Sequence, residues 1–131
     1  MDPTPRHQAR ERALTLLYEA ELKGVRPTDV VDALAVAPDP FTTTLLGTVD
    51  GRGEEIDSLI DTAAIGWDLD RMAVVDRNVL RLAVAELLEE VDTPTAVILN
   101  EAVELATAYS TDDSGRFVNG ILATLATQIR G

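Results

Sequence analysis

Basic side chains that could bind an anion gather near the start of the chain. Arg6 and Arg10 are four residues apart in the segment RHQARER, so they share one face if that segment is a helix, and His7 lies beside Arg6. Guanidinium groups on a helix edge can hold phosphates through paired hydrogen bonds. The alternative is an ordinary solvated helix start, which the local pattern alone favours.

The segment STDDSGRFVNGIL, residues 110–122, places an aromatic ring at an expected helix start. Asp113 or Ser114 can cap that helix, because short polar side chains accept hydrogen bonds from its free amides. Phe117 then falls in the first turn. An exposed ring there can stack on an unpaired base, with Arg116 beside it and the Asp113 carboxylate able to accept hydrogen bonds from a base edge. The alternative is that Phe117 belongs to the apolar stripe of the same helix.

Two further residues have roles that depend on the packing. Gly120 has no side chain and is expected to let another helix pack closely against this segment. Tyr18 lies two turns beyond Arg10 on the first expected helix. Its ring can pack while its hydroxyl reaches solvent, so core, surface and contact roles stay open.

The chain lacks the residues from which most active sites are built. It has no cysteine, no glycine-rich phosphate loop and a single histidine, His7, which argues against a histidine-based triad or a zinc site. Glu101 and Glu104 lie three residues apart, as paired catalytic carboxylates can, but a solvated helix face is the simpler interpretation. We therefore predict no enzyme activity, no cofactor and no metal ion.

The net charge of −12 argues against a general nucleic-acid binder, because such proteins usually carry a basic excess. The charge is unevenly distributed. Residues 1–26 carry five basic and four acidic side chains, whereas residues 27–131 carry six basic and nineteen acidic ones. An anion would therefore be attracted only near the N-terminus.

Apolar residues recur at three- and four-residue spacing along almost the whole chain, which indicates helices rather than strands. We predict an all-α protein of six or seven helices in one domain, residues 1–131. The expected helices lie near residues 6–23, 27–35, 41–63, 75–88, 94–106 and 114–129, with a short helical piece after Asp68 or Asp70. Gly51 and Gly53 should weaken and bend the third helix. Residues 1–65 and 68–131 look like two groups of three helices.

The start of the chain shows no apolar leader, since Arg6, Arg10, Glu11 and Arg12 interrupt its first residues. No run of about 18 apolar residues could span a bilayer. The absence of cysteine fits a reducing compartment. We therefore expect a soluble, cytoplasmic protein without membrane contact.

Three blocks of the sequence resemble the NusB family of bacterial transcription antitermination factors. They are RHQARERALTLLYEAE at residues 6–21, VDRNVLRLAVAELL at residues 75–88, and VILNEAVELATAYSTDDSGRFVNGIL at residues 97–122. The last block is the most specific, because a capped helix start followed by Phe-Val-Asn-Gly is hard to obtain from amphipathicity alone.

The resemblance implies an all-helical fold in which two three-helix groups pack across each other. It also implies a function without catalysis. The family binds the boxA element of nascent ribosomal RNA leaders and pairs with NusE, a small-subunit ribosomal protein. That heterodimer joins other Nus factors on RNA polymerase and suppresses termination.

The resemblance assigns roles to individual positions. The implied RNA-binding residues are Arg6, His7, Gln8, Arg10, Tyr18, Asp113, Arg116 and Phe117. The implied NusE-binding residues are Asp76, Arg77 and Leu80. Relatives often have a longer arginine run, which His7 and Gln8 interrupt here. The phosphate contacts should therefore be weaker, and a basic NusE should supply much of the affinity.

Two other interpretations stay open. Some ribosomal RNA cytosine methyltransferases carry a NusB-like N-terminal domain, beside a separate catalytic domain that uses cysteines. A helical protein-interaction module without an RNA role is the second, and full burial of Phe117 would favour it. A homodimer that covers the arginine face of the first helix also stays open.

Overall fold

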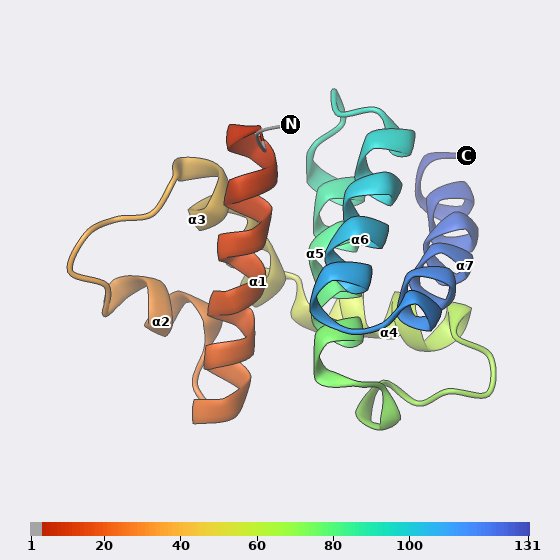
Figure 1. Cartoon of the computed structure of the whole chain (residues 1–131), viewed down its shortest axis with the longest axis horizontal. Coiled ribbons are helices and arrows are strands. Elements are labelled where there is room, and N and C mark those ends of the chain that lie inside the picture. Colours follow the sequence, from red (N-terminus) through yellow and green to blue (C-terminus); the bar gives the residue numbers. More distant parts are fainter. Residues whose placement is uncertain (1–3) are drawn as a thin grey trace.

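The computed structural model describes residues 4–131, which form seven α-helices, one 3-10 helix and no strands (Figure 1). The elements are α1 (Pro5–Lys23), α2 (Pro27–Asp32), α3 (Pro40–Gly51), α4 (Gly53–Ala63), η1 (Leu69–Arg71), α5 (Val74–Glu89), α6 (Thr95–Tyr109) and α7 (Asp112–Arg130). The all-α prediction is confirmed. Within the described residues, no helix has an apolar stretch long enough to cross a bilayer.

Helices α1, α2 and α3 form the first group, at the left of Figure 1. Pro5 occupies the first turn of α1, where a missing N–H does no harm, and the Thr4 hydroxyl caps the helix by accepting a backbone hydrogen bond at 3.1 Å. The helix ends at Gly24, whose φ of 66° suits a residue without a Cβ. Buried Thr42 of α3 donates its hydroxyl to the Ala9 carbonyl at 2.9 Å and ties the two helices together.

The expected long third helix is two helices. Arg52, with φ −116° and ψ 25°, separates α3 from α4, so the glycines on either side of it interrupt the helical pattern. α4 packs mainly on α5 and α7, which belong to the second group. The division between the groups therefore falls at Arg52 rather than near residue 65, and the second group holds four helices rather than three.

α5 is the central helix, with α1 and α3 on one side and α4, α6 and α7 on the other. Most of its residues are buried, including the charged Glu86. Arg10 of α1 donates from Nε and from Nη2 to the two oxygens of Glu86, each at 2.8 Å, and both side chains are almost inaccessible to solvent. This two-bond contact satisfies both charges at the boundary between the two groups.

The end of α5 is held by the end of α7. The Arg130 guanidinium donates to the carbonyls of Leu87, Glu90 and Thr93 at 3.1, 2.8 and 2.6 Å. Carbonyls at a helix C-terminus lack partners within their own helix. Arg130 supplies those partners and fixes the last turn of α7 on α5.

The start of α7 is capped by Thr111, whose Oγ1 accepts a hydrogen bond from the Ser114 amide at 3.1 Å. The prediction that Asp113 or Ser114 is the cap is therefore wrong. Thr111 has the extended backbone that a cap residue adopts, whereas Asp113 and Ser114 already lie inside the helix. Asp112 and Asp113 in the first turn suit the positive end of the helix dipole, as expected.

The close helix contact expected at Gly120 occurs at Gly115 instead. A Cβ on Gly115 would lie 2.6 Å from Thr107 Oγ1 and 3.4 Å from Val103 Cγ1, both on α6. A Cβ on Gly120 would meet no atom within 4 Å. α6 and α7 therefore approach each other through Gly115, and Gly120 faces outward.

Removing one partner of the Arg10–Glu86 pair should destabilise the protein strongly. Arg10→Met leaves a buried carboxylate without a countercharge, so we expect the free energy of unfolding to fall by about 3–5 kcal/mol. Urea denaturation measures the loss. Arg12→Met is the matched control, because Arg12 is exposed, and it should change stability by less than about 0.5 kcal/mol. Equal effects for the two substitutions would contradict the role given to Arg10.

Alanine should have different effects at the two glycines of α7. Gly120→Ala should raise the free energy of unfolding by about 1 kcal/mol, because alanine favours the helix and its methyl group meets open space. Gly115→Ala has to displace the Thr107 side chain and should give no gain. In a Thr107→Ala background the gain at Gly115 should reappear. Equal stabilisation at both glycines in the wild-type background, measured by denaturation, would rule out the close contact.

Candidate nucleic-acid interface

Arg6 lies exposed at the start of α1, with its guanidinium over the ring of Phe41 on α3. The guanidinium carbon is 3.9 Å from the ring centroid, which is a cation–π contact. The side chain borders an open cleft of about 500 Å³ together with Asp39 and Glu90. A guanidinium stacked on a ring keeps its N–H edges available for an anion. No pattern in the sequence indicates that Phe41 supports Arg6.

Arg10 does not share this exposed position. Its side chain is 4% exposed and is held by Glu86. The expectation that Arg6 and Arg10 together present a phosphate-binding face is therefore wrong for Arg10. One turn after Arg6, α5 covers this side of α1. Arg10 has a structural role in this protein.

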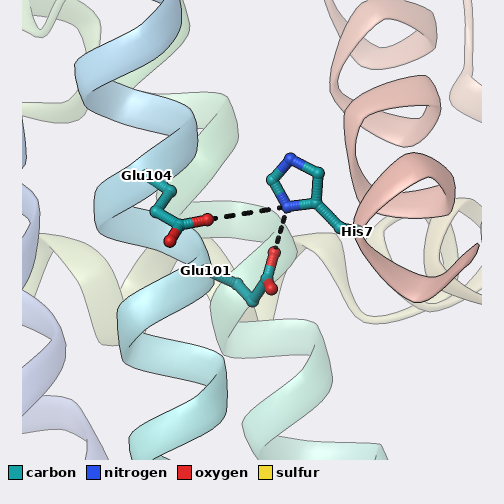
Figure 2. A group of neighbouring side chains, drawn as sticks. All are labelled: His7, Glu101 and Glu104. Carbon is teal, nitrogen blue, oxygen red and sulfur yellow. Dashed lines mark hydrogen bonds and ion pairs between the residues drawn. The ribbon is translucent and has the colours of Figure 1, made fainter. Parts of the chain in front are cut away.

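His7 points toward Glu101 and Glu104 on α6 (Figure 2). Its Nδ1 is 2.6 Å from Glu101 Oε2 and 3.7 Å from Glu104 Oε2, and its Nε2 is 3.6 Å from Glu11 Oε1. The hydrogen bond to Glu101 raises the pKa of His7 above its ordinary value of 6.5; partial burial opposes the rise, and the neighbouring carboxylate charges add to it. His7 thus joins α1 to α6 and is less available to a phosphate than expected.

His7, Glu101 and Glu104 offer one nitrogen and two carboxylate oxygens within 4.8 Å of one another. Divalent cations can use such a donor set. Two contacts already satisfy these groups without an ion. Nδ1 of His7 is bonded to Glu101, and Arg10 Nη1 lies 3.8 Å from the same carboxylate. The expected solvated face holds for Glu104, which is exposed, but Glu101 is partly buried in this ion-pair network.

Tyr18 lies at the surface, 42% exposed, beside a groove of about 290 Å³ between α1, α5 and α6. Leu14, Val75 and Tyr109 also line this groove. The Tyr109 hydroxyl donates to Glu11 Oε2 at 2.8 Å, which raises the pKa of the tyrosine. Tyr109 was missed by sequence reasoning, because at the end of α6 it reads as one more apolar residue of the helix.

Phe117 is half-buried. It is therefore neither the freely exposed ring nor the fully buried core residue that the sequence left open. It packs against the hydrophobic core and also contacts Trp67, with ring centroids 5.8 Å apart and planes at 73°. Trp67 was missed, because nothing in its local sequence links it to a helix far along the chain. Asp113 and Arg116 are exposed on the same helix start and pair with each other.

The three residues expected to meet NusE do not form a surface. Leu80 is completely buried, and Asp76 is 7% exposed and accepts a hydrogen bond from the Ser114 hydroxyl. Arg77 donates two hydrogen bonds of 2.8 Å to Glu21 of α1. Leu80 is therefore corrected as a surface contact, whereas Asp76 borders a pocket beside α7 and Arg77 is half-buried against α1. NusE binding at Asp76 and Arg77 stays a prediction.

Tyr18 and Phe117 lie toward one end of the molecule and Arg6 lies toward the other. The depressions beside Tyr18 and Phe117 both border the first turn of α5, because Val75 lines one of them and Asp76 lines the other. The separation of Arg6 and Tyr18 corresponds to about 18 Å along α1. Figure 1 shows the start of α1 at the top and the start of α7 at the bottom. A ligand that touches both regions must be extended.

Comparisons with known proteins identify relatives of this chain by sequence and by fold. The NusB family model matches residues 7–127. The transcription antitermination protein NusB of Thermobifida fusca (strain YX) is 48% identical over 124 residues, which cover 92% of this chain and 87% of the relative. NusB of T. maritima has a TM-score of 0.87 at 34% identity, covering 97% of this chain and 94% of that one. A chain from a crystal structure of NusB and NusE in complex with double-stranded RNA has a TM-score of 0.79 at 30% identity, covering 95% and 99%.

The helical fold and these likenesses define a class of protein, the transcription antitermination factors, which are not enzymes. Within that class, this chain belongs to the NusB family. The resemblance carried by three blocks of the sequence is confirmed, and the match extends through the residues between them.

The His7 network should make stability depend on pH. Because the pKa of His7 is raised in the folded state, the imidazolium form stabilises the protein below the unfolded value near 6.5, and that contribution is lost as the pH rises through the folded value. The free-energy difference between wild type and His7→Asn should be at most about 1 kcal/mol and larger near pH 6 than near pH 8. Urea denaturation at both pH values measures it. A difference that grows with pH would contradict the network.

Proposed function

We propose that this chain binds boxA-type RNA of nascent ribosomal RNA transcripts jointly with NusE and so helps RNA polymerase read through terminators. The observation that carries the proposal is the likeness to the NusB chain of a NusB–NusE–RNA complex, which extends over 95% of this chain. The exposed aromatic and basic groups of this chain support it further. They lie in two separate regions, one at the start of α1 and one near the start of α7.

The proposed RNA contacts divide into two regions. Arg6 contributes charge at the start of α1, where its guanidinium is exposed. At the opposite end Tyr18 and Phe117 offer aromatic surface, and Asp113 and Arg116 lie on the exposed start of α7. Arginine suits phosphate contacts, and the rings suit unpaired bases.

The charge of this chain explains why a partner is needed. Glu11, Glu101 and Glu104 surround His7, the neighbour of Arg6 in the chain, so an RNA strand that reaches Arg6 meets negative charge nearby. The excess of acids over bases in the whole chain adds to the repulsion. A basic NusE would offset both. We infer that the heterodimer, with other Nus factors, is the form that acts on RNA polymerase.

The proposal is tested by titrating fluorescent boxA-type RNA with this protein, with and without NusE, over a series of salt concentrations. We expect measurable binding chiefly with NusE. Arg6→Ala should weaken binding and reduce the slope of log K against log salt by about one, because one phosphate contact is lost. Phe117→Leu should weaken binding about tenfold and leave that slope unchanged, because a ring that stacks carries no charge.

Lys23→Ala is the matched control, because it removes the same charge from an exposed position at the far end of α1. An equal effect of Lys23→Ala and Arg6→Ala would show that net charge, and not a contact at Arg6, governs binding. Tight, salt-insensitive binding by this chain alone would overturn the role given to NusE. A folded heterodimer that binds no RNA would overturn the proposed function.

A further inference from the structure

A small pocket lies where η1 meets the starts of α5 and α7. Its volume is about 170 Å³, and Trp67, Asp76 and Phe117 are among the residues that line it. Arg71 and Asp113, both exposed, also border it. The pocket therefore combines aromatic rings, an acidic group set deep in the wall, and a cation at the edge.

Trp67 provides an open aromatic surface in this pocket. Its side chain is 54% exposed although tryptophan is the largest apolar residue. Because its ring meets that of Phe117 at 73°, the two rings form a corner and do not cover each other face to face. Uncovered ring faces are the surfaces on which bases of single-stranded nucleic acids stack.

Asp76 provides an acceptor without a partner. Its side chain is 93% buried, since only 7% of it is exposed. Oδ2 accepts a hydrogen bond from the Ser114 hydroxyl at 3.1 Å, but Oδ1 has no hydrogen-bond partner among residues 4–131. A buried polar atom is normally paired, because leaving it unpaired costs free energy. Asp76 lines the pocket, and neighbouring atoms cover Oδ1, so a donor in the pocket can supply the missing bond once that cover moves aside.

We propose that this pocket binds one nucleobase that carries an amino group. The base stacks on Trp67 in the corner formed with Phe117, and its amino N–H donates to Asp76 Oδ1. The exposed guanidinium of Arg71 meets the phosphate of the same nucleotide. This inference rests on the proposed function, and it assigns Trp67, Asp76 and Arg71 to RNA binding.

The Asp76 carboxylate makes the pocket selective. A carboxylate only accepts hydrogen bonds, so it favours an edge that offers an amino group, as cytosine, adenine and guanine do. Uracil has no amino group and places carbonyl oxygens on both sides of its single N–H, which a carboxylate repels. The pocket therefore discriminates against uracil.

The first test uses Trp67 as its own reporter, because it is the only tryptophan of the chain. Short single-stranded homopolymers of cytidine, adenosine and uridine are added to the heterodimer with NusE, and tryptophan emission is followed. The same titration with Trp67→Phe subtracts any signal from NusE. We expect strong quenching by cytidine and adenosine strands and weaker quenching by uridine. Trp67→Ala should weaken cytidine binding about tenfold, and Trp67→Phe should retain most of it.

The second test changes the acceptor while keeping the shape. In Asp76→Asn the amide oxygen can still accept from Ser114, and the amide N–H₂ then points into the pocket as a donor. The preference for cytidine over uridine should fall about tenfold, because the pocket atom now matches a carbonyl. Asp68→Asn is the control, since it removes the same charge beside Trp67 from an exposed side chain; it should strengthen binding of all three homopolymers equally.

The outcomes separate this inference from the proposed function. RNA that binds the heterodimer without changing Trp67 emission, and whose base preference is the same in Asp76→Asn, would overturn the pocket and leave the proposed function standing. A folded heterodimer that binds no RNA at all would overturn both.

Discussion

The Arg10–Glu86 ion pair lies where the two helix groups meet, and the rest of the interface is arranged around it. A buried charge is tolerated only when it is paired and hydrogen-bonded, so α1 and α5 can dock in one register alone. That register turns His7 toward α6 and leaves Tyr18 beside Val75 at the surface. The positions of Arg6 and Tyr18 on α1 thus depend on a pair of buried side chains.

The acidic side chains of this protein are partly used as internal partners for its few cations. Arg77 and Arg81 are held by Glu21 and Asp57, and Arg10 is held by Glu86. These three basic groups are therefore committed within the fold, whereas Arg6 is exposed and stacked on a ring. In the proposed RNA complex, such a protein contributes shape and aromatic surface, and the partner supplies positive charge.

The sequence alone predicts the helices well, but it predicts poorly which elements pack against each helix. Apolar periodicity located α1 and α5, and the glycines beside Arg52 marked where the third helix breaks. Periodicity cannot tell which neighbour covers a face, so Arg10 and Leu80 appeared available although α1 and α5 bury them. The contact between Trp67 and Phe117 and the close approach at Gly115 depend on distant segments, and no local pattern encodes them.

The sequence separation of the Arg10–Glu86 pair, 76 residues, has a consequence for synthesis of the chain. On a ribosome, the first three helices emerge well before α5 does, and until then the guanidinium of Arg10 stays in water. The apolar side of α1 that packs on α5 is uncovered for the same period. The first group therefore cannot complete its packing until α5 has emerged, and the native interface closes as a late, long-range step.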